Sequence, residues 1–299
     1  MKTTRRTILK TMALLTTLAL PAVAFAKYQP HELRTVVDDV HAAALRGEKP
    51  IVVMDLDDTL INTRDRTRRI MADFARSTAV QTSNPLDAET LEHLSDGDIR
   101  YNLPDTFKDA GITDPALLAS AQAFWLGRFF SNDYAATDVP NPGAVDYVNA
   151  LHNLGATIVY LTGRDTPRMG AGTRSNLIGS GFPVDDRGLL MIKPDKSIDD
   201  LQFKKDAFAS IGEMGKVTGV FENEPRNVNA MHTAFPDATP IFLDTIHSSA
   251  PDVVADGISF VRNFHGPSGL EWDSYALALQ QPPAATASYA SSSGAGIRR

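Results

Sequence analysis

Two aspartates, Asp55 and Asp57, directly follow the apolar run Pro50–Met54, which is typical of a strand buried on both faces. Side chains two positions apart in an extended segment share a face, so both carboxylates can point into one site. Two carboxylates at the end of a buried strand repel each other unless a cation compensates. The pair therefore indicates a functional site rather than a solvated turn.

A second apolar run, Thr157–Leu161, continues as Thr162-Gly163-Arg164. A hydroxyl group with a turn of backbone N–H groups can form a concavity that binds an oxyanion or a phosphate. Ligands of open α/β sheets bind beyond the carboxyl ends of the strands. We therefore expect this turn and the aspartate pair to lie at the same edge of one sheet.

Strand-like and helical segments alternate along most of the chain, which predicts a mostly parallel, Rossmann-like α/β sheet with helices on both faces. Between the two site motifs the pattern from 61 to about 138 is instead mostly helical. The later strand-like runs are Leu189–Ile192, Val217–Phe221, Pro240–Leu243 and Ile258–Val261, and the clearest helical segments are His31–Arg46, Pro115–Phe130 and Ala144–Leu154.

The composition of the 299 residues excludes several classes of protein. The absence of cysteine excludes disulfides, thiolate zinc sites, iron–sulfur clusters and a catalytic thiol. A formal charge of -7 argues against a nucleic-acid partner. The histidines form no H-x-x-x-H pair and no G-x-S-x-G string occurs, so zinc and serine hydrolases are disfavoured.

Residues 1–26 have the pattern of a secretory signal, with basic residues, no acid and an apolar run that ends in Ala-Phe-Ala. The apolar run is too short to span a bilayer, which predicts a removed signal rather than a stable membrane anchor. Arg5 and Arg6, followed by Leu9 and Lys10, match a twin-arginine signal for the export machinery. We therefore expect a periplasmic or secreted bacterial protein, with a flexible, Pro/Ala/Ser/Gly-rich tail over 281–299.

The string Asp55-Leu56-Asp57-Asp58-Thr59-Leu60, together with Thr162 at the end of the second strand, resembles the first two motifs of the haloacid dehalogenase (HAD) superfamily. The resemblance covers the chain from about Pro50 to Phe264. It implies a phosphoric monoester hydrolase that acts on a small-molecule phosphate ester. It also implies a HAD-like core over 27–60 and 140–270, with an all-helical cap inserted over 61–139.

The resemblance implies roles for individual residues as well. Asp55 would attack phosphorus to form an aspartyl-phosphate, and Asp57 would protonate the leaving oxygen and then activate water. Mg²⁺ would lie against Asp55, the backbone carbonyl of Asp57 and an acid of a fourth motif. The phosphoryl group would be held by Asp57, Asp58, Thr162, Gly163 and the lysine of a third motif.

The third motif is expected to be a lysine that offsets the negative charge of the nucleophile and the phosphate. The family places it at the start of the helix before the fourth strand, and Phe203–Ile211 is predicted to be that helix. Lys204 is therefore favoured, while Lys193 and Lys205 stay open.

The fourth motif departs from the family pattern, because Glu222-Asn223-Glu224 follows the strand and Asn223 stands where a metal-binding aspartate is expected. Glu222 and Asn223 are the expected metal ligands, and Glu224 stays open as a third candidate. Two alternatives to hydrolysis also stay open. One is phosphotransfer to an alcohol acceptor, and the other is a non-catalytic protein that binds a phosphoryl ligand, which the missing aspartate motivates.

The arginines at 64, 66, 68 and 69 form the most conspicuous charge run of the chain. On one helix, positions 64 and 68 share a face while 66 and 69 share another. We interpret the run as a solvated helix face.

Overall fold

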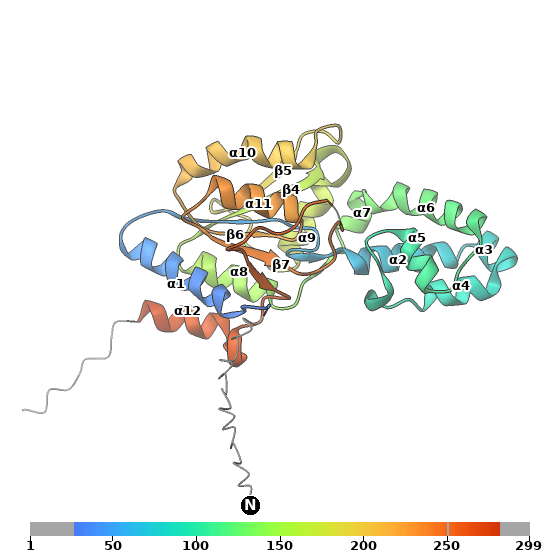
Figure 1. Ribbon diagram of the computed structural model, residues 1–299, viewed down its shortest axis with the longest axis horizontal. Helices are drawn as coiled ribbons and strands as arrows, with labels where there is room; N and C mark the ends of the chain where they lie inside the picture. The colour runs from blue at the N-terminus through green and yellow to red at the C-terminus, as the bar shows by residue number, and fades with distance from the viewer. Residues whose placement is uncertain (1–26, 250, 282–299) are drawn as a thin grey trace, which may run out of the picture.

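The structure, a computed structural model, describes residues 27–249 and 251–281. The predicted signal over 1–26 and all but the first residue of the predicted tail over 281–299 lie outside the described residues. Within the described residues, one six-stranded sheet has the order β5-β4-β1-β6-β7-β8 with every neighbouring pair parallel, which confirms the predicted fold class (Figure 1). Its strands are β1 (Pro50–Met54), β4 (Thr157–Asp165), β5 (Gly188–Lys193), β6 (Lys216–Glu222), β7 (Thr239–Leu243) and β8 (Ser259–Val261).

The apolar strand β1 lies inside the sheet and is buried along its whole length. Its side chains alternate between two hydrophobic clusters, with Val52 and Met54 on one face and Ile51 and Val53 on the other. Because helices cover both faces, polar chemistry is confined to the strand ends (Figure 1). The covering helices are α1 (His31–Leu45), α8 (Ala144–Asn153) and α9 (Ala171–Gly179) on the first face, and α10 (Asp200–Met214) and α11 (Pro225–Ala234) on the second. Helix α12 (Trp272–Gln280) packs on α8 from outside this layer (Figure 1).

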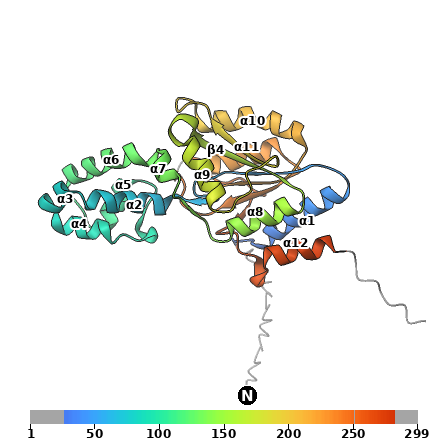
Figure 2. The same ribbon diagram turned by 180° about the vertical axis from the view of Figure 1, so that it is seen from behind.

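The helices within residues 61–139, called the cap here, lie to one side of the remaining α/β core (Figures 1 and 2). The cap has its own hydrophobic cluster, which includes Ile70, Phe74, Leu91 and Phe107. No helix in the part of the chain that the structure describes is long and apolar enough to cross a membrane. The cap helices are α2 (Thr63–Ala75), α3 (Thr78–Ser83), α4 (Pro85–Glu92), α5 (Leu103–Asp109), α6 (Pro115–Phe129) and α7 (Asn132–Ala135).

Two short antiparallel strands, β2 (Ile61–Asn62) and β3 (Val139–Pro140), connect the cap to the core. Next to them, Asn141 donates from its backbone N to Leu60 O at 2.8 Å and from its side chain to Thr59 O at 2.6 Å. These hydrogen bonds therefore hold the last residues of the cap connection against the turn that follows Asp57.

Candidate active site

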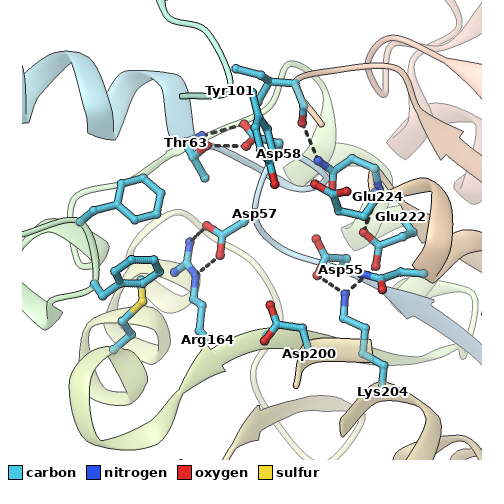
Figure 3. A pocket seen from close by; sticks show the side chains of 17 residues that line it. Asp55, Asp57, Asp58, Thr63, Tyr101, Arg164, Asp200, Lys204, Glu222 and Glu224 are labelled. Atoms are coloured by element: carbon cyan, nitrogen blue, oxygen red, sulfur yellow. Dashed lines mark hydrogen bonds and ion pairs between the residues drawn. The ribbon is translucent and has the colours of Figure 1, made fainter. Parts of the chain in front are cut away.

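The carboxyl ends of β1, β4 and β6 open into a pocket of about 210 Å³ (Figure 3). The cap closes this pocket, the candidate catalytic pocket, from the opposite side with Tyr101, Phe129 and Phe130. The charged residues of its wall are Asp55, Asp57, Asp58, Arg164, Asp200, Lys204, Glu222 and Glu224.

Lys204 lies between two buried carboxylates, those of Asp55 and Glu222, and donates to both. The distance from Lys204 Nζ to Asp55 Oδ1 is 2.6 Å, and Asp55 Oδ2 accepts no hydrogen bond from the described residues. Burial and the nearby charge of Glu222 raise the pKa of Asp55 to about 8, against the opposing effect of Lys204. Since one ammonium group faces two carboxylates, further positive charge here would favour the ionised form of Asp55.

The other two candidate lysines lie away from Asp55. Lys193 is buried at the end of β5, where Nζ donates to Ile198 O at 2.8 Å and pairs with Asp200. Lys205 is exposed on α10. Of the three lysines, the structure brings only Lys204 to Asp55.

The carboxylate of Asp57 is held by two arginines. Arg164 binds it through both oxygens, with Nε to Oδ2 at 2.9 Å and Nη2 to Oδ1 at 2.7 Å, and Arg66 Nη2 reaches Oδ1 at 2.9 Å. Burial raises the pKa of Asp57, but the charges of Arg164 and Arg66 outweigh it and hold the pKa well below its ordinary value. The ionised form of Asp57 is therefore strongly favoured.

Asp138, at the end of the cap, completes this network. It accepts from Arg66 Nε at 2.7 Å and from Arg164 Nη2 at 2.8 Å, and all three side chains are at most 1% exposed. The two arginines and Asp138, together with Asp57, form what we call the arginine clamp. A buried charge must be paired, and here each guanidinium faces two carboxylates.

The interpretation of the arginine run as a solvated face is wrong for Arg66, whose side chain is 0% exposed. The cause is the position of α2, which starts two residues after the cap enters at Ile61 and so points its first turn at Asp57. Arg68 and Arg69 remain partly exposed and pair with Asp65.

Arg66, Arg164 and Asp138 were not among the predicted site residues. The position of Arg164, directly after Thr162-Gly163, is a signal that could have found it. Nothing in the local sequence marks Asp138.

The irregular last residues of β4, Thr162–Asp165, bring Gly163, rather than the hydroxyl of Thr162, to the pocket wall. Thr162 is fully buried, and its hydroxyl accepts from Arg164 N at 3.2 Å. A Cβ at Gly163 would lie 2.6 Å from Asp200 Oδ2, the end of a side chain that is 49% exposed, so a larger residue here would have to displace the Asp200 carboxylate. In this arrangement Thr162 fixes the turn that aims Arg164 at Asp57.

Asp58 closes the turn between β1 and the cap. Its φ of 57° lies in the left-handed region, and both carboxylate oxygens accept from Thr63, one of them from Thr63 N at 3.1 Å. Burial raises the pKa of Asp58 to about 7, in spite of the hydrogen bond from Thr63. These hydrogen bonds thus connect the turn after β1 to the start of α2.

The acidic residues of the fourth motif already have partners. Glu222 Oε1 accepts from the backbone N of Asn223 and of Glu224, each at 3.0 Å, while Oε2 binds Lys204. Glu224 accepts from Ser248 N at 3.1 Å and from the Ser248 hydroxyl. Glu222 therefore acts on the site through Lys204 and through the backbone turn.

Two neutral amide oxygens remain for a metal. Asn223 donates through Nδ2 to Ile246 O at 2.7 Å, which turns its Oδ1 the other way, toward Thr59 Oγ1 at 3.4 Å. Asn227, which the sequence analysis did not single out, lines the pocket with a buried Oδ1 that has no hydrogen-bond partner.

These donors fit Mg²⁺ in kind, because Asp55 Oδ2, Asn223 Oδ1 and Asn227 Oδ1 are all oxygens and Mg²⁺ binds oxygen. The excess negative charge around Asp55 also fits a cation. Within 27–249 and 251–281, no group of three or more His, Cys, Asp or Glu side chains is placed to hold a metal ion. The candidate metal site therefore depends on amide oxygens as well as on Asp55.

No family model matches the chain, and no curated protein matches it in sequence. Among solved structures, the chain is similar to a Clostridium difficile protein described as a candidate phosphatase, with 15% identity, 67% of this chain and 88% of that chain covered, and a TM-score of 0.44. A haloacid dehalogenase-like hydrolase from Burkholderia xenovorans is 18% identical, with 73% and 96% covered and a TM-score of 0.40. CbbY from Rhodobacter sphaeroides, solved with phosphate, is 13% identical, with 73% and 95% covered and a TM-score of 0.40. These similarities are too low to assign an activity to the chain.

Proposed function

We propose that the protein hydrolyses small-molecule phosphomonoesters in a Mg²⁺-dependent reaction through an aspartyl-phosphate on Asp55. The observation that supports this most strongly is the state of the Asp55 carboxylate. Lys204 fixes Oδ1 at 2.6 Å, while Oδ2 is free of hydrogen bonds from the described residues at a pocket closed by the cap. A nucleophile held on one side and open on the other is suited to in-line attack on phosphorus.

In the first step, Asp55 Oδ2 forms a bond to phosphorus, and the bond from phosphorus to the ester oxygen breaks. The leaving oxygen takes a proton from protonated Asp57, which is left as the carboxylate. In the second step a water molecule gives a proton to Asp57 and attacks phosphorus, which releases phosphate and restores the Asp55 carboxylate. The arginine clamp favours ionised Asp57, which suits this second step, whereas protonating the leaving oxygen requires the minor, protonated form.

Mg²⁺ would be held by Asp55, the backbone carbonyl of Asp57 and Asn223, with Asn227 beside them. When bound there, it supplies positive charge that offsets the repulsion between Asp55 and the phosphoryl oxygens. Lys204 adds to this compensation from the other side of Asp55, and the backbone at Gly163 leaves room for the phosphoryl group.

The decisive experiment measures p-nitrophenyl phosphate hydrolysis by the purified protein with Mg²⁺, with EDTA, and in Asp55→Asn. We expect turnover that EDTA removes and that falls at least 10⁴-fold in Asp55→Asn, because the variant lacks the nucleophile. Asp237→Asn, which changes an exposed aspartate away from the pocket, is the matched control and should keep full activity. Turnover that survives in Asp55→Asn would rule out the covalent mechanism.

The second candidate function is non-catalytic binding of a phosphoryl ligand. It is favoured by one observation, the neutral amides of Asn223 and Asn227 on the metal side of the pocket. Saturable binding of inorganic phosphate without turnover of any phosphomonoester would support it over hydrolysis. Product analysis with added glycerol separates hydrolysis from phosphotransfer, because only phosphotransfer yields glycerol phosphate.

A further inference from the structure

A second cavity, of about 400 Å³, lies beside the catalytic pocket where the cap meets the core. We call it the arginine cavity, and its walls include Arg64, Arg100, Tyr101, Asp244, Ile246 and Arg262. Tyr101 and Ile246 also line the catalytic pocket, so the two spaces adjoin. Figure 3 shows Tyr101 among the side chains that line the catalytic pocket. A ligand whose phosphoryl group faces Asp55 can therefore extend past Tyr101 into the arginine cavity.

The two spaces have opposite charge. Acidic side chains outnumber basic ones in the wall of the catalytic pocket, whereas three arginines and one carboxylate line the arginine cavity. That carboxylate, Asp244, is already neutralised, since it accepts from Lys27 Nζ and from the Tyr28 hydroxyl at 2.6 Å each. The arginine cavity thus offers positive charge that no acid in its own wall compensates.

Two of its arginines have unused donors. Among the described residues, neither Arg64 nor Arg262 has a carboxylate within ion-pair distance. Arg64 Nε is buried and has no hydrogen-bond partner. Arg262 is held 4.0 Å over the ring of Tyr28, which orients the guanidinium without using its N–H groups. Arg100 differs, because it already binds Asp109 at 2.8 Å.

A buried guanidinium N–H without an acceptor is costly, and the planar donors of arginine match carboxylate and phosphate oxygens. We propose that the arginine cavity binds a second anionic group of the substrate through Arg64 and Arg262. The preferred substrates are then phosphomonoesters that also carry a carboxylate or a second phosphate. This inference rests on the proposed phosphatase function and specifies its substrate class.

Pairs of substrates that differ only in the second anion test the inference. D-3-phosphoglycerate and sn-glycerol 1-phosphate share the configuration at C2 and differ by a carboxylate in place of a hydroxymethyl group, and fructose 1,6-bisphosphate and fructose 6-phosphate differ by a phosphate. We expect kcat/KM to be at least tenfold higher for the more anionic member of at least one pair. The pair with the larger ratio identifies the group that the arginine cavity accepts. Ratios near one in both pairs would overturn the inference.

Charge-removing variants locate the effect. In the double variant Arg64→Gln/Arg262→Gln the ratio should fall to near one, and each single variant should lose part of it. Arg174→Gln, which removes an exposed arginine of α9 that lines neither space, should keep the wild-type ratio. A ratio that the double variant leaves unchanged would overturn the inference even if the wild-type protein prefers anionic substrates.

A binding measurement separates failure of this inference from failure of the proposed function. Calorimetry of Asp55→Asn with the more anionic substrate of each pair needs no turnover. We expect the Kd to rise at least tenfold when Arg64→Gln/Arg262→Gln is added. Such a rise in a protein that hydrolyses none of the phosphomonoesters would overturn the phosphatase function and keep the anion site. If Arg64→Gln/Arg262→Gln left the Kd unchanged while the wild-type protein hydrolysed its substrates normally, the anion site would be overturned and the phosphatase function kept.

Discussion

The core and the cap use charged residues differently. In the core, buried charges converge at the strand ends, where Lys204 is 2% exposed and lies between Asp55 and Glu222. In the cap, ion pairs such as Arg76 with Glu92 lie largely at the surface, outside its separate hydrophobic cluster. Arg66 and Asp138 are cap residues that enter the charge network of the core. The core therefore determines the chemistry, and the cap acts on it through a few side chains.

The largest effect is expected in the core, for Lys204→Met. The variant leaves two buried carboxylates without their shared counter-charge, which should lower the free energy of unfolding by about 3–5 kcal/mol. Urea unfolding at neutral pH measures this change in the free energy of unfolding. The adjacent control, Lys205→Met, removes an exposed charge and should change stability by about 0.5 kcal/mol or less. Similar values for the two variants would contradict the role of Lys204 as a buried ion-pair partner.

A smaller loss of stability is expected for Arg66→Met, which cuts the ionic contact between cap and core. Arg164 still pairs with Asp57 and Asp138 in this variant, so we expect about 2–3 kcal/mol rather than the full cost of an unpaired charge. The control is Arg68→Met, which changes an arginine of the same helix whose side chain is 35% exposed. It should lower the free energy of unfolding by about 1 kcal/mol or less. If Arg68→Met were the more destabilising change, α2 would not face the core as described.

The next effect concerns the metal side of the pocket. Asn223→Asp replaces a neutral oxygen by an anionic one and should lower the Mg²⁺ concentration for half-maximal activity by about tenfold, since ligand charge tunes affinity. A magnesium titration of p-nitrophenyl phosphate hydrolysis measures it. Asn153→Asp, exposed at the end of α8, is the control with the same change of charge. An unchanged magnesium dependence in Asn223→Asp would remove Asn223 from the set of metal ligands.

The smallest effect is expected at the surface of the cap. Arg76 Nε lies 2.7 Å from Glu92 Oε1, but the two side chains are 58% and 32% exposed. A double-mutant cycle with Arg76→Ala and Glu92→Ala should give a coupling energy below about 1 kcal/mol, because water screens the pair. A coupling energy above about 2 kcal/mol would show that this surface pair is coupled as strongly as a buried pair, which would contradict the difference between cap and core.

The parts of the molecule that the sequence predicts are those set by local patterns. The β-branched run Pro50–Met54 forms β1, and the aspartates after it reach the pocket because a parallel strand presents its carboxyl end there. The same holds for Gly163, near the carboxyl end of β4. Lys204 could be favoured over Lys193 because it lies in the first turns of the helix that precedes β6, which is again a matter of chain order.

The remaining site residues depend on how the cap docks against the core. Helical periodicity shows that Arg66 and Arg68 lie on different faces, but not which face meets Asp57. Asp138 precedes β3 in a segment without a motif, and its burial follows only from the two arginines that reach it. Asn227 lies within α11, where an asparagine has no distinguishing pattern. Such residues acquire their roles from contacts between segments far apart in the chain.

The junction between cap and core has a consequence for how the protein unfolds. The cap has its own hydrophobic cluster, so on packing alone it could open or melt as an independent unit. However, the two backbone connections between cap and core run side by side as β2 and β3. In addition, Arg66 donates hydrogen bonds to Asp57 in the core and to Asp138, in the last residues of the cap. Separating the two bodies would expose or unpair these buried charges. The backbone amides of Ile61, Asn62 and Val139 should thus exchange as slowly as those of residues 51–54 in β1, and cap and core should unfold in a single cooperative transition.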